Sequence, residues 1–336
     1  MPSSSQPARD GLRPLPRTIL GYVVRFTGRH QVALAALSIA VFALSAVPLE
    51  LQRRIINGIV DKGPLRTVLL LAAGYAGIAV VEQSLKLVLN IYRGWVAEDA
   101  VRRLRILLHT GIFNGPGTHP SSSDAGMEIA MMLEEAEPIG SFAGLAVSQP
   151  LLQLGILSSV VGYMIFLEPL LALVSLAFFV PQLIFVPWLQ SAVNRRAQDR
   201  ILTKREISSV LVESVSTVLP QLGLGKTLIR RVFDFNMSIY RLKYAMYLLM
   251  NLMHFLGVAT AMALGGWLTL KGRIEVGTVV AIVGGLGKLN DPWGDLVDWG
   301  RELSVVAVKY RLFVDAVARL VGRKPASETQ PMRVAT

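Results

Sequence analysis

Residues 65–112 read LRTVLLLAAGYAGIAVVEQSLKLVLNIYRGWVAEDAVRRLRILLHTGI, and this stretch decides the fold. Its first part, to about residue 91, is mostly apolar and is long enough to cross a hydrocarbon core of about 30 Å. Its second part, from Arg93 to Ile112, has no proline and only two glycines, Gly94 and Gly111. The helix is therefore expected to continue past the membrane, by about 30 Å for roughly 20 residues.

Five further segments are apolar over a similar length. Hydrophobic residues make up 52% of the 336 residues and charged residues only 17%, whereas soluble domains carry about 25% charged residues. The sixth segment is the least apolar, because its inner half carries charges. The sequence predicts an all-α integral membrane protein with six long transmembrane helices and cytosolic helical extensions. The expected spans lie near residues 31–51, 65–91, 143–167, 169–193, 244–270 and 276–299.

Basic residues are spread unevenly along the chain, whose formal charge is +11. If the N-terminus is cytoplasmic, twenty-six of the 34 basic residues lie in the N-terminal arm, the two inner loops and the C-terminal segment. Only six lie in the outer loops, and Lys86 and Lys288 lie within spans. This bias follows the positive-inside rule. It predicts cytoplasmic N- and C-termini in an inner or plasma membrane, contact with membrane lipid, and no nucleic-acid partner.

The regions outside the spans differ in character. Residues 1–14 and 321–336 are polar and are expected to be disordered arms. Residues 18–29 can form an amphipathic elbow helix that lies in the headgroup region. The outer turns, near residues 61–64, 168–169 and 271–273, are tight. The inner connections, 92–142 and 194–243, are long and rich in helix formers, so each is expected to be a helical hairpin.

Short motifs in this order and spacing resemble the exporter-type (type 1) transmembrane domain of ATP-binding-cassette (ABC) transporters, over residues 15–320. They are PLELQ at 48–52 with IINGIVD at 55–61, VRRLR at 101–105, GTVVA at 277–281 and LNDP at 289–292. The resemblance implies that six helices form half of a transport pathway. A homodimer or heterodimer is then required, domain-swapped because the fourth and fifth spans cross to the partner half.

The resemblance also implies that the tips of the inner hairpins are coupling helices, which seat in grooves of a nucleotide-binding ATPase. The tips are expected near residues 114–123 and 208–217. The first is crowded with glycine, proline and serine, which departs from the family pattern, so the second is the better candidate. The residues expected to couple to the ATPase partner are Asn114, Ser121, Ser209, Val210, Leu211, Glu213 and Val215.

Two glycine-rich stretches resemble phosphate-binding loops but lack essential parts. Gly225-Lys226-Thr227 has Pro220 where a phosphate-binding loop has its first glycine, and proline has no amide hydrogen to donate. Residues 284–288 are followed by Leu289 in place of the hydroxyl residue. The chain also has no cysteine and only four scattered histidines. We therefore expect no catalytic residue, cofactor or metal in this chain, which is not an enzyme by itself, and ATP and Mg²⁺ on a partner subunit.

Ionisable residues inside spans are costly and indicate function or pairing. Glu82 and Lys86 are four residues apart and are expected to pair. On the sixth span Asp291, Asp295, Asp298 and Glu302 fall within an arc of about 60°. This stripe either lines an inward-facing cavity and attracts cationic groups of the substrate, or it pairs with basic residues and water at the cytosolic boundary.

Two smaller features concern helix packing. Met250 and His254 lie in a methionine- and aromatic-rich part of the fifth span, which suits either a surface for varied apolar ligands or ordinary packing. The candidate substrate pathway therefore comprises Asp291, Asp295, Asp298, Glu302, Met250 and His254. Gly140 and Gly144 form a small-xxx-small pair, which predicts a close helix approach.

The sequence thus favours a permease subunit that moves an amphipathic substrate with ATP hydrolysed by a separate nucleotide-binding protein. Two alternatives remain. The chain could be a non-transporting scaffold or regulatory half-transporter, which the unusual first coupling tip favours. It could also be an ATP-independent carrier, which inverted internal repeats would favour.

Overall fold

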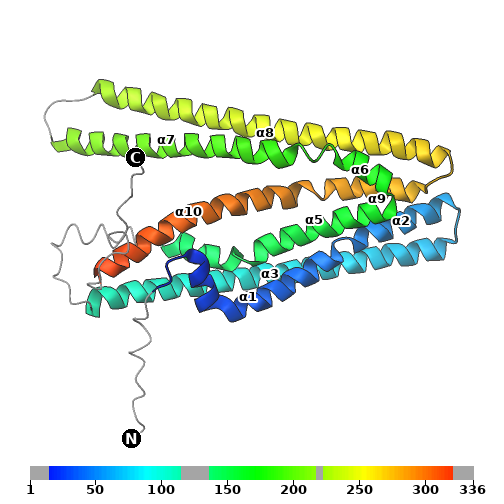
Figure 1. The fold of residues 1–336 in the computed structure, drawn as a ribbon, viewed down its shortest axis with the longest axis horizontal. Helices are drawn as coiled ribbons and strands as arrows, with labels where there is room; N and C mark the ends of the chain where they lie inside the picture. Colours follow the sequence, from blue (N-terminus) through cyan, green and yellow to red (C-terminus); the bar gives the residue numbers. More distant parts are fainter. Residues whose placement is uncertain (1–14, 115–135, 217–221, 321–336) are drawn as a thin grey trace, which may run out of the picture. The chain divides into compact units, whose positions relative to one another are not determined.

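The computed structural model of the protein describes residues 15–114, 136–216 and 222–320, which are helices joined by short turns (Figure 1). Residues 136–145 form a helix that leads into α5. The other helices are α1 (Ile19–Leu44), α2 (Val47–Val60), α3 (Leu65–Asn114), α5 (Ser148–Leu167), α6 (Pro169–Leu176), α7 (Gln182–Ser216), α8 (Leu222–Leu270), α9 (Val276–Gly287) and α10 (Asn290–Leu320).

The predicted helical extensions are present. α3 has 50 residues and continues without a break from its apolar half through Arg93 to Asn114. α7 has 35 residues and α8 has 49, and they pack against each other (Figure 1). At about 1.5 Å per residue α3 and α8 are each roughly 75 Å long, more than twice the thickness of a hydrocarbon core. The absence of proline in these extensions explains their continuity.

Four helical stretches in the described residues are long and apolar enough to cross a membrane: Ile19–Val60, Leu65–Leu107, Ala136–Leu167 and Gly225–Leu270. The other two expected spans are each divided into two helices. The fourth span breaks at residues 177–181, between α6 and α7, where Pro181 cannot donate a hydrogen bond back to Ala177. The sixth breaks at Lys288 and Leu289, between α9 and α10.

The break in the sixth span lies just before Asp291 and Pro292. α10 begins at Asn290, so Asp291 and Pro292 both lie in its first turn. A proline is tolerated there, because the first amide groups of a helix have no partner within it. Asp291 therefore stands one residue inside the helix and is not its cap.

The chain divides into two compact units. The first contains the described residues up to Pro48, Ala72–Ser159 and those from Asp291 onward. Its core is a cluster of buried side chains from α1, α3, residues 136–146 and α10, among them Tyr22, Phe142, Tyr310 and Phe313. The hydroxyl of Tyr310 donates to the carbonyl of Pro16 at 2.8 Å, which ties the start of the described chain to α10.

α1 begins with the residues that were expected to form an elbow helix. Thr18 caps it, since its hydroxyl accepts a hydrogen bond from the amide of Gly21. α1 continues to Leu44 without a break. Ile19 and Val23 are buried in the core of the first unit, whereas Leu20 and Val24 are 47% and 67% exposed. The apolar side of this segment is therefore shared between the protein core and the surface.

The close helix approach predicted for Gly140 and Gly144 is present. A Cβ on Gly140 would lie 2.6 Å from the amide nitrogen of Val101, and a Cβ on Gly144 would overlap the carbonyl oxygen of Arg93. Both neighbours belong to the backbone of α3. Only glycine therefore lets the helix at 136–145 approach α3 so closely.

The second unit contains Leu49–Leu71 and Val160–Asn290. In it α8 packs against α6, α7 and α9. Glycines again permit close contacts, because a Cβ on Gly265 would lie 2.8 Å from the Val279 side chain and one on Gly285 would lie 2.8 Å from the sulfur of Met164. The unit is therefore held by helix–helix packing at small residues, as is common in membrane proteins.

Candidate functional site

The acidic stripe of α10 meets polar side chains of α5 in the first unit. The Oδ2 atom of Asp295 accepts hydrogen bonds from the amide of Gln149 at 3.2 Å and from that of Gln153 at 2.5 Å. Gln153 is buried, whereas Asp295 keeps an exposed surface. Two neutral donors on α5 therefore fix the orientation of the Asp295 carboxylate, and the Asp295 side chain is still exposed at the surface.

A third helix brings a positive charge to this place. The Nε atom of Arg93, on α3, donates to the hydroxyl of Ser148 at 2.8 Å, and the charges of Arg93 and Asp295 attract each other. Ser148 is itself fixed, because its hydroxyl donates to the carbonyl of Gly144 at 3.0 Å. The close approach at Gly144 thus places Arg93 beside the start of α5.

The other carboxylates of the stripe have different surroundings. Asp298 is exposed and pairs with Arg301 on the same helix at 3.1 Å. Asp291 is exposed in the first turn of α10. Glu302 is half-buried, and burial raises the pKa of its carboxyl above the ordinary value, with Asp298 adding to the shift and Arg301 opposing it. The stripe is therefore partly paired and partly solvated, and its place in a substrate pathway stays a prediction.

The raised pKa of Glu302 gives a test of stability. Ionisation costs more in the folded protein than in the unfolded chain, so this carboxylate destabilises the fold above its folded pKa, and the penalty disappears below about pH 4. Glu302→Gln is expected to raise the Tm by a few degrees at pH 8 and to leave it unchanged at pH 4. Glu98→Gln, on an exposed face of α3, is the control, with no change at either pH. A gain of equal size at both pH values would contradict this explanation.

Met250 and His254 lie on α8, in the second unit. Both are half-buried. The carbonyl of Met250 accepts a hydrogen bond from the amide of Gln182 at 3.5 Å, and the ring of His254 lies 5.5 Å from that of Phe255. These contacts are compatible with ordinary packing. Asp295 therefore lies together with Gln149, Gln153 and Arg93 in the first unit, whereas Met250 and His254 belong to the second unit.

The expected coupling residues lie at or beyond the limits of the described chain. Asn114 is the last residue of α3, and residues 208–216 form the last turns of α7, so their backbone is helical. Their side chains lie outside the described residues, as does the whole of Ser121. The structure thus shows that α7 is helical up to Ser216. The coupling roles stay predictions for Asn114, Ser121, Ser209, Val210, Leu211, Glu213 and Val215.

Both glycine-rich stretches are helical. Gly225-Lys226-Thr227 lies in the first turns of α8, and residues 284–287 end α9. A phosphate-binding loop must wrap its backbone amides around the phosphates, which an α-helix cannot do because those amides bond within the helix. Neither stretch has the backbone of a phosphate-binding loop. Among the described residues there is also no group of three acidic or histidine side chains that could hold a metal ion.

The predicted pair in the second span is present, with Lys86 Nζ 2.6 Å from Glu82 Oε1. Glu82 is buried and its partner lies one turn away on the same helix. The pair therefore neutralises a carboxylate inside an apolar segment.

A polar cluster at the expected outer end of the second unit was missed from the sequence. Glu50 on α2 accepts hydrogen bonds from Arg53 at 2.9 and 3.0 Å, from Arg54 at 2.5 Å and from the hydroxyl of Tyr163 at 2.6 Å. Arg53 also donates to Glu275 at 2.8 Å. We name these five residues the outer cluster. It links α2 to α5 and to the start of α9.

Asn57 and Gly277 extend the outer cluster. The amide nitrogen of Asn57 donates to Glu275, and its carbonyl oxygen accepts from the backbone of Gly277 at 2.7 Å. A Cβ on Gly277 would overlap the carbonyl of Arg53. Two stretches that carry the family resemblance, 55–61 and 277–281, thus contact each other across more than two hundred residues of sequence. The sequence indicated both stretches but not the contact between them.

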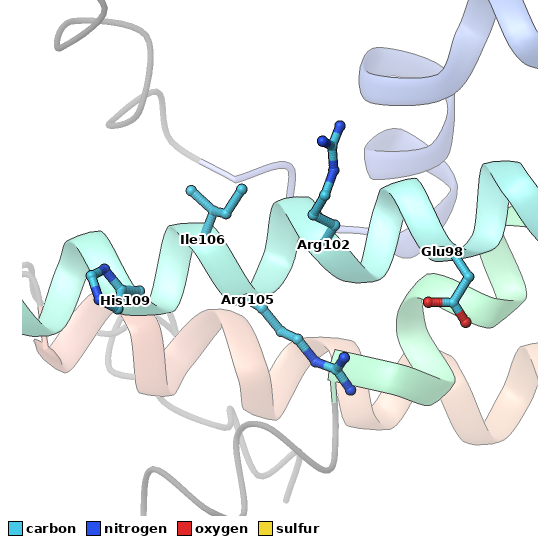
Figure 2. Close-up of a pocket in the computed structure, with 5 residues that line it drawn as sticks. All are labelled: Glu98, Arg102, Arg105, Ile106 and His109. Carbon is cyan, nitrogen blue, oxygen red and sulfur yellow. The ribbon is translucent and has the colours of Figure 1, made fainter.

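A shallow hollow of about 350 Å³ lies on the inner part of α3, lined by Glu98, Arg102, Arg105, Ile106 and His109 (Figure 2). Arg102 pairs with Asp99, and Arg105 lies 3.4 Å from Glu137. Figure 2 shows that Arg102 and Arg105 extend to different sides of the helix. Their charges do not converge on one point, so the hollow has no arrangement that would select a ligand.

The comparisons with known proteins agree with the architecture. The model of the family described as ABC transporter transmembrane region matches residues 32–218, from α1 through α7 and its hairpin tip. A search of curated proteins finds no match. Since residues 32–218 are more than half of the 336-residue chain, this protein belongs to the family of ABC transporter transmembrane regions.

Proposed function

We propose that this integral membrane protein is the permease subunit of an ABC transporter, and that it moves an amphipathic substrate with energy from ATP hydrolysed outside these 336 residues. The observation that carries the proposal is the α7–α8 hairpin, in a chain of this family. Both helices continue from apolar segments into long polar extensions. Such continuous helices can transmit a displacement at the hairpin tip to the membrane.

The two helices of the hairpin are expected to move together as one rigid body. α7 and α8 pack together, and Arg200 on α7 donates to the side-chain carbonyl of Asn236 on α8 at 3.1 Å. A pair of packed helices bends less than a single one. A force applied near residues 208–217 would therefore move α8 within the membrane. The coupling residues Ser209, Val210, Leu211, Glu213 and Val215 would receive it from a nucleotide-binding subunit carrying ATP and Mg²⁺.

The full architecture of the proposed subunit has six spans, with the interrupted pairs α6–α7 and α9–α10 serving as the fourth and sixth. Both termini would face the cytoplasm, as the distribution of basic residues favours. Two copies, or this chain and a related one, would form a domain-swapped dimer and enclose the pathway. Asp291, Asp295, Asp298, Glu302, Met250 and His254 are the residues proposed to line it.

The coupling hypothesis is tested by changing the hairpin tip. The double variant Val210→Asp, Leu211→Asp places two charges where apolar side chains are expected to dock. Each buried apolar side chain contributes about 1.5 kcal/mol or more, so binding of the nucleotide-binding partner should weaken by about 100-fold or more. The measurement is co-purification of the partner with the tagged protein from its own membranes.

The matched control is Lys226→Gln, on the exposed side of α8. Because residues 225–227 are helical and do not have the backbone of a phosphate-binding loop, this variant should retain the partner and its full ATPase activity. If a nucleotide-binding protein co-purifies equally with the double variant, the hairpin is not its docking site. If no nucleotide-binding protein co-purifies with the wild-type protein, the permease hypothesis is wrong and the scaffold or carrier alternative is favoured.

A further inference from the structure

Three helices of the first unit bring together five polar side chains near the inner end of the expected spans. They are Arg93 of α3, Ser148, Gln149 and Gln153 of α5, and Asp295 of α10. We name them the three-helix polar cluster. It holds one positive and one negative side chain that attract each other without a direct hydrogen bond between them among the contacts of the described residues.

The guanidinium of Arg93, the positive group of the cluster, is buried and lacks part of its hydrogen bonds among the described residues. Arg93 is only 8% exposed, and its Nε is bound to Ser148. Its Nη2 atom is buried and has no hydrogen-bond acceptor among the described residues. Leaving a charged donor without an acceptor in a buried place is costly, so an oxygen acceptor that reaches this guanidinium is strongly favoured.

The negative side of the cluster is exposed. The Oδ2 atom of Asp295 accepts hydrogen bonds from the side-chain amides of Gln149 and Gln153, which hold the carboxylate in one orientation. Asp291 and Asp298 flank it along the helix, and Arg301 forms an ion pair with Asp298. The surroundings of Asp295 therefore retain negative charge and favour a cation.

We propose that the three-helix polar cluster binds the headgroup of an amphiphile that carries both an ammonium group and an anionic oxygen. The ammonium pairs with Asp295, and the anionic oxygen accepts from Arg93 after a rotation of the guanidinium. This inference rests on the proposed function, because a ligand held within the membrane domain of a transporter is its substrate.

A charge argument favours a zwitterion over a simple cation. Arg93 is buried, and Asp295 is the carboxylate whose charge acts on it. A simple cation on Asp295 would neutralise that counter-charge and leave a buried guanidinium uncompensated. A zwitterion supplies a new anionic partner to Arg93 while its ammonium occupies Asp295. The buried guanidinium of Arg93 and the exposed carboxylate of Asp295 then both have a partner of opposite charge.

The test measures binding by tryptophan fluorescence, since Trp293 and Trp299 lie on α10 on either side of Asp295. The protein is placed in nanodiscs of phosphatidylglycerol, which contain no zwitterionic lipid. Four probes are titrated: lauroyl lysophosphatidylethanolamine, 2-aminododecanoic acid, lauroyl lysophosphatidic acid and dodecylamine. The first two are zwitterions with a phosphate or a carboxylate, and the last two carry one sign of charge in the headgroup.

At least one zwitterion should bind about tenfold more tightly than either singly charged probe, which corresponds to one additional charge-assisted hydrogen bond. Which zwitterion binds tells whether the natural ligand has a phosphate or a carboxylate. Asp295→Asn should weaken all probes with an ammonium group about tenfold, which removes the preference for zwitterions over lauroyl lysophosphatidic acid. Arg93→Gln should weaken all probes with an anionic group about tenfold, which removes the preference for zwitterions over dodecylamine, and Arg93→Lys should restore part of that preference.

The matched controls remove the same charges from the same helices at distant places. Arg66→Gln lies at the other end of α3 and Asp315→Asn lies further along α10, and neither should change the ranking of the probes. Equal affinity of the wild-type protein for dodecylamine and the zwitterions would show that the cluster binds only a cation, which would contradict the proposal. An Arg93→Gln variant that still binds the zwitterions more tightly than dodecylamine, with an unchanged Tm, would overturn the proposal.

Failure of this inference is distinguishable from failure of the proposed function. The binding assay uses the chain without ATP or a nucleotide-binding partner. If the protein co-purifies with an ATPase but binds zwitterions no more tightly than the other probes, the proposed permease function stands and the proposed substrate class is wrong.

Discussion

Gly144→Ala is expected to destabilise the protein strongly, although alanine is the better helix former. The new Cβ would overlap the carbonyl oxygen of Arg93 and would lie 3.2 Å from the Cβ of Ala97. The obstacle is the backbone of α3, a helix of 50 residues that cannot yield locally. Overpacking of this kind costs about 3 kcal/mol, the upper part of the usual range.

The displacement also separates Arg93 from Ser148, whose hydroxyl is bound to the carbonyl of Gly144. The effect therefore extends from packing to the three-helix polar cluster. The measurement is the Tm of the purified protein in nanodiscs, together with its yield from membranes. A decrease of several degrees and a low yield are expected.

Gly94→Ala is the matched control, one residue from Arg93 on α3. A Cβ there would meet no atom within 4 Å. The same substitution should therefore raise stability slightly, by about 0.5–1 kcal/mol, because alanine loses less conformational entropy in a helix. If both variants shift the Tm in the same direction, the close approach at Gly144 is not what holds these helices together.

Glu50→Gln is expected to have the second largest effect, because Glu50 is the acceptor shared by three donors of the outer cluster. The substitution weakens the bonds from Arg53, Arg54 and Tyr163 and leaves two guanidinium groups close together without their shared counter-charge. The Glu50 side chain is 25% exposed, so solvent screens part of the loss. We expect about 2 kcal/mol of destabilisation.

The measurement is again the Tm, combined with proteolysis of the segment between α2 and α3, which should become more accessible as α2 loses its links to α5 and α9. Glu98→Gln removes the same charge from an exposed position of α3 and should change neither quantity. Equal Tm values for Glu50→Gln and the wild-type protein would show that the outer cluster does not stabilise the second unit.

The sequence predicted the features that depend on local rules. The extensions of α3, α7 and α8 follow from long stretches without proline, and the Glu82–Lys86 pair follows from helical spacing. The Gly140–Gly144 pair correctly indicated a close helix approach. The division of the fourth span was missed, although Pro181 was visible, because its hydrophobic residues continue on both sides of the break.

The tertiary partners could not be predicted. The position of Gln149 and Gln153 opposite Asp295 depends on how α5 and α10 are aligned, and one turn of displacement would separate them. Arg93 begins the stretch that was expected to continue past the membrane, and the sequence did not indicate that it is buried beside Ser148. The same reason applies to the outer cluster, where Arg53 and Glu275 are more than two hundred residues apart in the chain.

We propose that ATP hydrolysed by a nucleotide-binding partner drives the conformational change of this protein, and one measurement tests this proposal most directly. The complex purified through the tagged chain is reconstituted in nanodiscs and its ATPase activity is compared with that of the chain alone. The permease account predicts activity only in the complex, lost in the Val210→Asp, Leu211→Asp variant and retained in Lys226→Gln. ATP hydrolysis by the chain alone, or a complex without any ATPase activity, would contradict it.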